Sequence, residues 1–277
     1  MLPPGGKARS AKGAPVSRAN CRLRFAAEVC ALATFLGASC AAAQTGWETP
    51  YVENLLDFQR NGNGSGQWKD TPKLYLPYRF DSGWTFTQKI AVPLVDTNAA
   101  GAGNTGGGYS GGIGDAYVEE IFVSPGIANN LSLKGSLRLV FPTGGPSPFG
   151  SGQYQLAPSA GVIYRMPELL AGVTLAPFAR YFWGFDPRYD GVKTTRKLDL
   201  FPEATFQLAE RWSLAFYPEN AITWNTRNGR WFVPLDLMLA HRVDGTLEYG
   251  FGGAVKLGNP SDPAYRYIID LRLAWRF

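Results

Sequence analysis

The fold is decided by the last eleven residues of the chain, Tyr267-Ile268-Ile269-Asp270-Leu271-Arg272-Leu273-Ala274-Trp275-Arg276-Phe277. Every second residue from Tyr267 onward is apolar, and the set has aromatic side chains at both ends. The intervening residues are small or charged, with Ile268 as the exception. Because successive side chains of a strand point to opposite faces of a sheet, one face of this segment suits hydrocarbon and the other suits water.

The chain ends on Phe277 with no polar residue after it. A terminal aromatic residue on an alternating strand is typical of bacterial outer-membrane β-barrels, in which the barrel assembly machinery reads it. The segment therefore predicts a membrane-crossing strand, with outer-membrane lipid on one side and the assembly machinery as a partner through Phe277.

The start of the chain resembles a secretory signal. Arg22 and Arg24 precede a short apolar run at 25–36, and three alanines precede Gln44. A positive region, an apolar region and a small-residue cleavage site are the three parts of such a signal. We expect residues 1–43 to be a signal peptide and leader, and 44–277 to be the exported domain. Cys40 leaves a lipoprotein as an alternative, although its neighbours fit that motif poorly.

Removal of this leader changes the charge of the chain. The full sequence has a net charge of +5, but six of its 27 basic residues and one of its 22 acidic residues lie in 1–43, which leaves 21 of each. A neutral mature chain gives no electrostatic support for a nucleic-acid partner. All three cysteines also lie in the leader, which fits export into an oxidising compartment and excludes a thiolate metal site.

Alternating runs of about ten residues recur along the rest of the chain, the length that membrane-crossing strands require. No run of 18 apolar residues is present that would predict a membrane helix. The alternation is found in eleven segments: 72–80, 84–94, 115–124, 130–141, 154–165, 172–185, 197–208, 212–224, 231–240, 246–257 and 267–277.

The connections between these runs alternate between short and long, as in barrels with short periplasmic turns and longer outer loops. An even number of strands, with both ends periplasmic, requires one more strand, and 52–59 is the candidate, with 60–71 as its outer loop. The sequence thus predicts an all-β, transmembrane, antiparallel up-and-down barrel of 12 strands, or of ten if 52–59 is not a strand. The glycines of the 95–113 loop follow no phosphate-binding spacing, so no cofactor is expected.

Several short segments resemble one family of outer-membrane proteins. The segments are Gly112-Ile113-Gly114-Asp115, Leu139 to Gly144, Gly152 to Ser159, and Trp224 to Leu235 with its second Trp and its Pro-Leu pair. In this order they resemble the transporter-like barrels grouped with the phenol-degradation meta-cleavage pathway, over roughly residues 72–277. The resemblance implies an outer-membrane location and passage of small hydrophobic or aromatic solutes.

The water-facing positions carry charges of both signs. Basic residues lead on the strands between 130 and 185, and acidic residues lead between 196 and 248. The candidates for a lumen constriction are Lys134, Arg138, Arg180, Asp199, Glu203, Glu219, Asp236, Glu248, Asp270 and Arg272. Arg165, Lys197 and Lys256 share their parity. Two interpretations stay open: a network that only neutralises buried charge, and a constriction whose transverse field selects solutes.

His241 is the single histidine, and its parity points it outward near the periplasmic rim. An outward His with a Ser could serve a lipid-modifying enzyme, but no Ser of outward parity lies beside it, so an interfacial girdle position is favoured. Glu119 and Glu120 point to opposite faces and cannot act together. Outward Glu120 would be costly at mid-membrane, unless the register differs or it lies near an interface. The tryptophans near strand ends predict aromatic girdles: Trp84, Trp183, Trp212, Trp231 and Trp275.

Five prolines fall within predicted strands, although Pro removes a ladder donor and is normally confined to edges or bulges. They are Pro158, Pro177, Pro202, Pro218 and Pro234. We expect bulges or local openings there, which either shape a small barrel or let a solute leave sideways into the membrane.

Taken together, the sequence predicts an outer-membrane channel or transporter for passive passage of small, hydrophobic or aromatic compounds, without enzymatic activity. The alternatives are a lipid-modifying enzyme and a structural or adhesive barrel.

Overall fold

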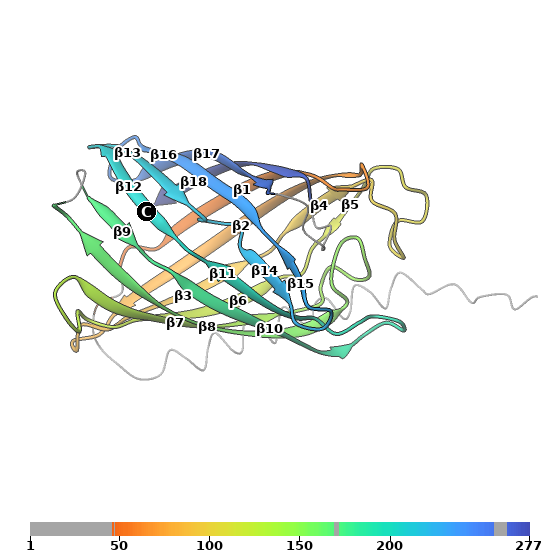
Figure 1. Cartoon of the computed structure of the whole chain (residues 1–277), viewed down its shortest axis with the longest axis horizontal. Coiled ribbons are helices and arrows are strands. Elements are labelled where there is room, and N and C mark those ends of the chain that lie inside the picture. The colour runs from red at the N-terminus through yellow and green to blue at the C-terminus, as the bar shows by residue number, and fades with distance from the viewer. Residues whose placement is uncertain (1–45, 47, 169–171, 258–264) are drawn as a thin grey trace, which may run out of the picture. The chain divides into compact units, whose positions relative to one another are not determined.

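The computed structural model describes residue 46 and residues 48–168, 172–257 and 265–277. The predicted leader 1–43, with its cysteines, lies outside the described residues. Within them the chain is all-β, a closed antiparallel barrel of 12 strands without helices (Figure 1). No helix among these residues is long and apolar enough to cross a membrane.

Six of the 12 strands are continuous. They are β1 (Tyr51–Arg60), β2 (Gly66–Arg79), β7 (Leu131–Val140), β8 (Gln153–Met166), β17 (Leu247–Lys256) and β18 (Tyr267–Arg276). Each of the other six is interrupted and forms two segments. The pairs are β3 (Thr85–Ala91) and β4 (Leu94–Thr97), β5 (Ser110–Ile113) and β6 (Tyr117–Val123), β9 (Val173–Leu175) and β10 (Phe178–Pro187), β11 (Arg196–Phe201) and β12 (Ala204–Ala209), β13 (Trp212–Phe216) and β14 (Ile222–Asn225), and β15 (Arg230–Phe232) and β16 (Pro234–Arg242).

The barrel closes where the first strand meets the last. β1 pairs with β18 in antiparallel register from Tyr51 opposite Arg276 to Arg60 opposite Tyr267. β1 pairs with β2 on its other side, from Tyr51 opposite Tyr75 to Arg60 opposite Gly66. A closed ladder leaves no edge strand, so the backbone groups can satisfy one another where no water is present. The candidate strand at 52–59 is therefore confirmed, and with it the count of 12 rather than ten.

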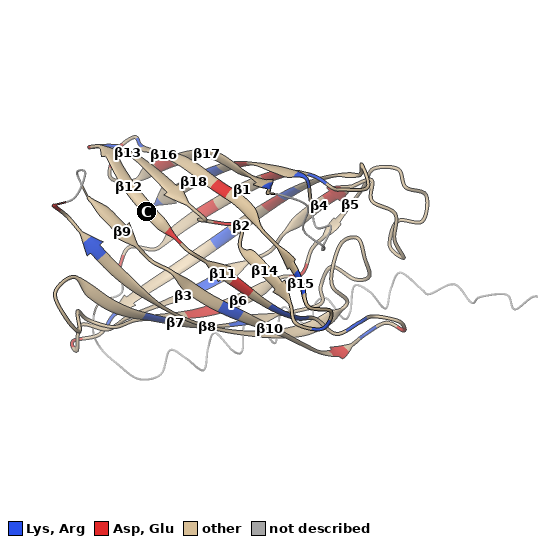
Figure 2. Ribbon diagram, in the orientation of Figure 1, with Lys and Arg blue, Asp and Glu red and all other residues tan. Residues whose placement is uncertain are grey.

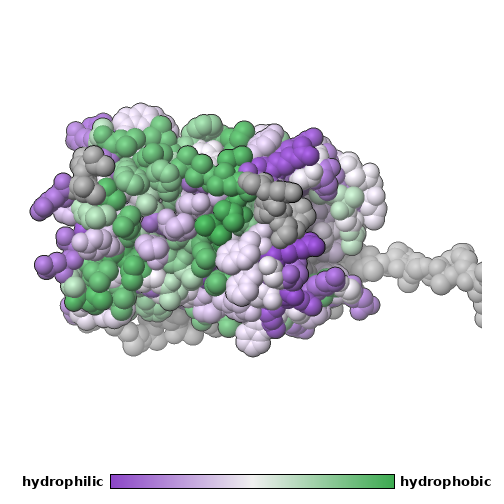
Figure 3. Space-filling view, in the orientation of Figure 1, coloured by the Kyte–Doolittle hydropathy of each residue, from purple (hydrophilic) through white to green (hydrophobic). Residues whose placement is uncertain are grey.

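The two faces of each strand follow the predicted alternation. In β18, the apolar set that includes Leu271 and Trp275 is exposed on the outside, whereas Ile268 and Asp270 are buried on the inside. Apolar side chains cover the middle of the wall, and hydrophilic ones gather toward its ends (Figure 3). The predicted girdle tryptophans are all exposed, as amphipathic rings at a membrane interface would be.

Two expected loop boundaries are wrong. The expected outer loop 60–71 is only five residues long, at 61–65, because β2 begins at Gly66 and continues the ladder with β1. The expected loop 95–113 shrinks to 98–109, because β4 extends to Thr97 and β5 begins at Ser110. In both places the strand continues through small and polar residues that, in isolation, favour loops.

Prolines mark most of the strand interruptions. Pro177 and Pro202 lie in the breaks between β9 and β10 and between β11 and β12, and Pro218 lies between β13 and β14. β16 begins at Pro234, directly after the break at Val233 that separates it from β15. Pro158 stays within β8, but the β8–β10 ladder skips its position, passing from Ser159 to Leu156. The predicted local irregularities at prolines are confirmed, since Pro cannot donate to the ladder.

Candidate functional site

Charged residues are found along the strands and not only at their ends (Figure 2), and many of them are buried in ion pairs on the inner face. The predicted lumen residues are buried or half-buried, and most of them pair with an opposite charge in this interior. Arg165 is the exception to this burial, because it is exposed near the end of β8. The paired charges reduce the cost of keeping ions away from bulk water.

Glu119 on β6 is the centre of one network. Its side chain accepts hydrogen bonds from Arg138 Nη2 at 2.6 Å, from Arg138 Nε at 3.1 Å and from Ser136 Oγ at 2.7 Å. Arg180 on β10 also donates to Glu119 and completes the network from the far side of β8. Since Glu119 is 1% exposed, one carboxylate holds two arginines in a largely desolvated place.

A second network lies on β1, β2 and the break between β13 and β14. Lys73 Nζ is 2.7 Å from Glu53 Oε1 and 3.3 Å from Glu219 Oε1. Four residues earlier on the same face of β2, Lys69 Nζ is 2.6 Å from Asp57 Oδ2. These contacts join predicted Glu219 to residues that the sequence reasoning did not place in the lumen.

Further pairs complete the lining. Lys134 Nζ is 4.0 Å from Glu203 Oε2, and Lys197 Nζ is 2.8 Å from Asp199 Oδ2. Arg272 Nη2 donates to Glu248 Oε1 at 2.6 Å. The predicted candidates are thus brought together in neighbouring groups rather than in one ring.

Asp236 and Asp270 are held by neutral partners. Asp236 Oδ2 accepts from the backbone N–H groups of Glu219 and Asn220, at 3.0 and 2.7 Å. Asn220 Nδ2 reaches Asp270 Oδ2 at 3.4 Å. Asp270 lies directly opposite Asp57 across the closing seam, and one oxygen of each carboxyl group has no hydrogen-bond partner among the described residues. Like charges directly opposite each other destabilise a strand pair.

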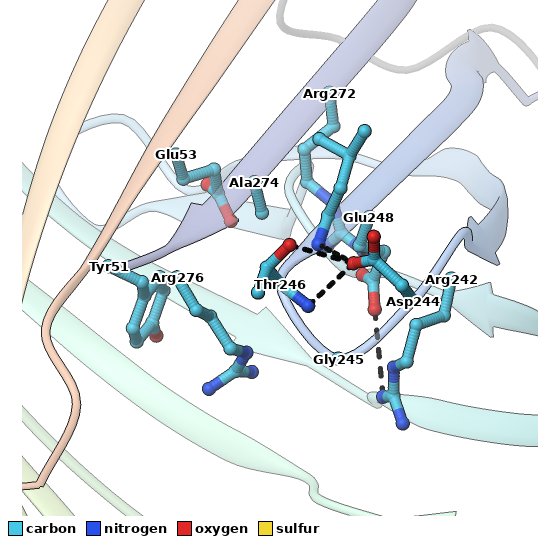
Figure 4. A pocket seen from close by; sticks show the side chains of 11 residues that line it. Tyr51, Glu53, Arg242, Asp244, Gly245, Thr246, Glu248, Arg272, Ala274 and Arg276 are labelled. Carbon is cyan, nitrogen blue, oxygen red and sulfur yellow. Dashed lines mark hydrogen bonds and ion pairs between the residues drawn. The ribbon is translucent and has the colours of Figure 1, made fainter.

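A polar pocket of about 180 Å³ lies at the end of the barrel that carries the 243–246 turn. Arg242, Arg272 and Arg276 line it together with Glu53 and Glu248, and the ion pairs of Glu248 cross it (Figure 4). The turn itself is fixed by Asp244, which accepts hydrogen bonds from Thr246 and Leu247. These hydrogen bonds, of which the one from the Thr246 hydroxyl contributes most, hold the pKa of Asp244 below its ordinary value.

An apolar pocket of about 510 Å³ lies in the wall where three neighbouring strands are interrupted. Pro177, Pro202 and Ile222 border it at these breaks. Its lining includes Phe178, which shares the inward parity of Arg180, and Ala179, which has the outward parity. The pocket therefore contacts residues of both faces of the wall.

Gly161 on β8 allows this part of the wall to close up. A Cβ at this position would lie 2.4 Å from Pro177 O and 2.4 Å from Phe178 Cβ. Beside it, the rings of Phe178 and Phe201 stack with their centroids 4.3 Å apart. A side chain at 161 would displace the backbone where the strand is already interrupted.

Two of the segments that carry the family resemblance, Gly112 to Asp115 and Leu139 to Gly144, lie together near the long loops. Asp115 accepts hydrogen bonds from the backbone N–H groups of Ser151 at 2.6 Å and Gly144 at 3.2 Å. Thr143 Oγ1 donates to Gly114 O at 2.7 Å and accepts from Ala116 N at 2.8 Å. Two segments that the sequence singles out separately, Gly112 to Asp115 and Leu139 to Gly144, therefore fix the 141–152 loop on the β5–β6 break together with Ser151.

His241 faces outward, as predicted, and belongs to an aromatic cluster. Its ring centroid is 4.4 Å from that of Trp212 and 5.2 Å from that of Tyr249. Ser213 lies next to Trp212 but pairs with Ala240, so it points to the opposite face. Among the described residues, no cluster of three or more His, Cys, Asp or Glu side chains is arranged to hold a metal ion.

Several inward charges are absent from the lumen candidates predicted from the sequence. They include Glu53, Asp57, Lys69, Lys73, Lys89 and Arg276. The alternation within 52–59 could have revealed the inward positions of Glu53 and Asp57. Lys69 could not be assigned to a face because it lies in a stretch that the sequence predicts as a loop. Glu120, next to Glu119, faces outward as expected, so the alternative of a different register is wrong. Its Oε1 accepts a hydrogen bond from Gln88 Nε2 at 2.8 Å.

Solved structures support this fold at low sequence identity. The chain is similar to an outer membrane channel from Pseudomonas putida F1, with a TM-score of 0.61, 12% identity, and coverage of 85% of this chain and 97% of that one. It is also similar to the beta domain of the Bordetella autotransporter BrkA, with a TM-score of 0.51, 11% identity, and coverage of 83% and 98%. These likenesses concern the fold.

No protein-family model matches the chain, and the comparison with curated proteins finds no match. The resemblance to the phenol-pathway barrels therefore stays a prediction. What the structure itself defines is a closed 12-stranded barrel with an interior that carries charges of both signs.

Proposed function

We propose that this protein is a channel of the bacterial outer membrane through which small, apolar or aromatic compounds pass without an energy source. The end with the short turns and both ends of the barrel domain would face the periplasm. An exposed apolar outer face with rim tryptophans supports residence in a bilayer. The structural neighbour from Pseudomonas putida F1, itself an outer membrane channel, supports the same class.

The proposed class of solute rests on the apolar pocket in the wall. Its volume of about 510 Å³ lies in the range that holds small molecules. Most of its lining has the outward parity, whereas Gly161, Phe178 and Phe201 have the inward parity. The pocket lies at breaks where Pro177 and Pro202 lack the N–H groups that would close the ladder. We propose that apolar solutes pass between the lumen and the membrane at this place, while the paired charges restrict polar ones.

Filling the pocket tests this route. Ala179→Trp introduces a large ring at an outward position of the lining. The expected result is at least a several-fold slower exchange of a neutral aromatic probe such as toluene or benzyl alcohol across the outer membrane of cells that contain the variant, with an unchanged ionic current in planar bilayers. The matched control is Leu271→Trp, at an outward, 49% exposed position on β18 that does not line the pocket.

Equal exchange rates for the two tryptophan variants and the wild type would contradict the proposed route through the wall. Folded wild-type protein that gives no current in planar bilayers and no faster probe exchange in cells than a deletion strain would contradict the channel function. The two results are separable because the current and the probe exchange are measured independently.

We propose no enzymatic role. The rival lipid-modifying activity would need a nucleophile beside His241, whose ring instead contacts Trp212 and Tyr249. The His241→Ala variant should transport as the wild type does, and loss of a measurable lipase activity in this variant would contradict the proposal.

A further inference from the structure

Cationic groups and aromatic rings alternate with one another across six neighbouring strands on the inner wall. Arg276 lies over the Tyr51 ring at 4.9 Å, and the Tyr51 and Tyr75 rings stack with centroids 4.3 Å apart. Lys89 Nζ lies 5.0 Å from the Tyr75 centroid. We name this set the cation–aromatic belt; its members are Arg276, Tyr51, Tyr75, Lys89, Tyr117 and Arg138.

The strand register brings the belt together. Tyr51 lies opposite Arg276 on β18 and opposite Tyr75 on β2, and Tyr75 lies opposite Lys89 on β3. Tyr117 on the next strand continues the belt, with Lys89 Nζ at 5.8 Å and Arg138 Cζ at 4.1 Å from its ring centroid. The belt is therefore a product of neighbouring strands at one level of the barrel, although its members are spread from residue 51 to residue 276.

Lys89 differs from the other lysines of the interior. Lys69, Lys73 and Lys197 each have a carboxylate oxygen within 3 Å. In the described part of the chain, Lys89 has no carboxylate oxygen within 4.0 Å, and its ammonium group lies over the faces of the Tyr75 and Tyr117 rings. A ring face stabilises an ammonium group but does not neutralise its charge.

The charges that surround Lys89 do not balance. Glu119, directly opposite it on β6, already accepts from two arginines, and Glu219 and Glu53 share Lys73. The group comprises five cations and four carboxylates: Lys73, Lys89, Lys134, Arg138 and Arg180, and Glu53, Glu119, Glu203 and Glu219. One positive charge is left over, and Lys89 is the cation without a carboxylate partner.

We propose that the cation–aromatic belt binds small aromatic carboxylates, with Lys89 as the residue that receives the carboxylate. An ammonium group with free donors suits an anionic oxygen, and the tyrosine faces suit the edge or face of the solute ring. This inference rests on the proposed channel function, and it adds to the proposed neutral solutes a second group, aromatic compounds that carry one negative charge.

Calorimetric titration of the full-length protein in detergent with benzoate tests the binding directly. The wild type should bind benzoate, and Lys89→Gln should weaken binding by about tenfold or more, as expected when a hydrogen-bonded charge partner is lost. The matched control is Lys197→Gln, which removes the same charge from the same interior but at a lysine that already has Asp199. This control should change benzoate binding by less than about twofold.

Two further ligands test the chemistry of the belt. Acetate has the charge without the ring and benzyl alcohol has the ring without the charge, so both should bind at least tenfold more weakly than benzoate. Equal effects of the two lysine variants, equal binding of acetate and benzoate, or no benzoate binding by folded wild type would each overturn the inference. Because binding is measured without a membrane, a protein that binds benzoate but carries no current would instead contradict the channel function alone.

Discussion

Replacement of Glu119 by Gln is the sharpest test of the charged interior. The substitution keeps the size of the side chain but removes the charge that Arg138 and Arg180 share. Glu119 is 1% exposed and Arg180 is 7% exposed, so water cannot take over the lost interaction. Removing one partner of a buried ion pair costs about 3–5 kcal/mol. Since the Gln oxygen can still accept one hydrogen bond, we expect a loss near the lower value, about 3 kcal/mol.

Urea unfolding in detergent, followed by tryptophan fluorescence, measures this loss. The unfolding midpoint should fall while the slope of the free energy against urea stays unchanged, because the exposed surface of the unfolded chain is the same. The matched control is Glu120→Gln, one residue along on the same strand but on the lipid-facing side, where Gln88 is its partner. This control should leave the stability unchanged or raise it, since a carboxylate on that side carries a depth-dependent cost.

A second substitution identifies the cause. Combining Glu119→Gln with Arg180→Met removes one of the two arginines that would be left without a partner. The double variant should therefore lose less stability than the sum of the two single changes. If Glu120→Gln proved more harmful than Glu119→Gln, or if the two substitutions in the double variant were additive, the assignment of Glu119 as the centre of the network would be wrong.

Three other predictions concern the seam, the loops and the chain end. At pH 9, where both carboxyl groups are ionised, Asp270→Asn should raise the unfolding free energy by about 0.5–1 kcal/mol, because it removes a like charge opposite Asp57; a loss of stability in the same urea assay would contradict this. Asp115→Ala removes the acceptor of two backbone hydrogen bonds and should speed proteolysis within 141–152 by about tenfold or more, whereas an unchanged cleavage rate would show that these bonds do not fix the loop. Removal of Phe277, whose side chain is 65% exposed, should lower the yield of folded barrel in the outer membrane but not refolding of the purified chain, and a normal yield in cells would argue against its role in assembly.

The sequence predicted the fold through properties that are local to each strand. The alternation of Leu271 and Leu273 with Asp270 and Arg272 is visible in any window of this segment, and the structure places the two sets on opposite faces. A strand at 52–59 follows from the requirement for an even number of strands, which needs only the expectation that both ends of the barrel lie on one side. Both properties follow from the period of a strand and from barrel closure, which do not depend on the neighbours of a residue.

The partners of the charged residues could not be predicted in the same way. Lys69 pairs with Asp57 because β2 starts at Gly66 and not after residue 71, which only the register of β1 and β2 reveals. Glu119 was recognised as one of two carboxylates on opposite faces, but its arginines come from β7 and β10. The belt around Lys89 depends on five strand registers at once. Pairings between strands that are distant in the sequence are fixed by cross-strand geometry, which single-strand patterns do not contain.

The proposed function depends most directly on whether the folded barrel conducts. Recordings from planar bilayers should show stepwise currents for the wild type, and Glu119→Gln should shift the reversal potential in a salt gradient toward anions, since it adds one net positive charge to the interior. Folded wild-type protein that inserts into the bilayer and leaves it electrically sealed would contradict the account.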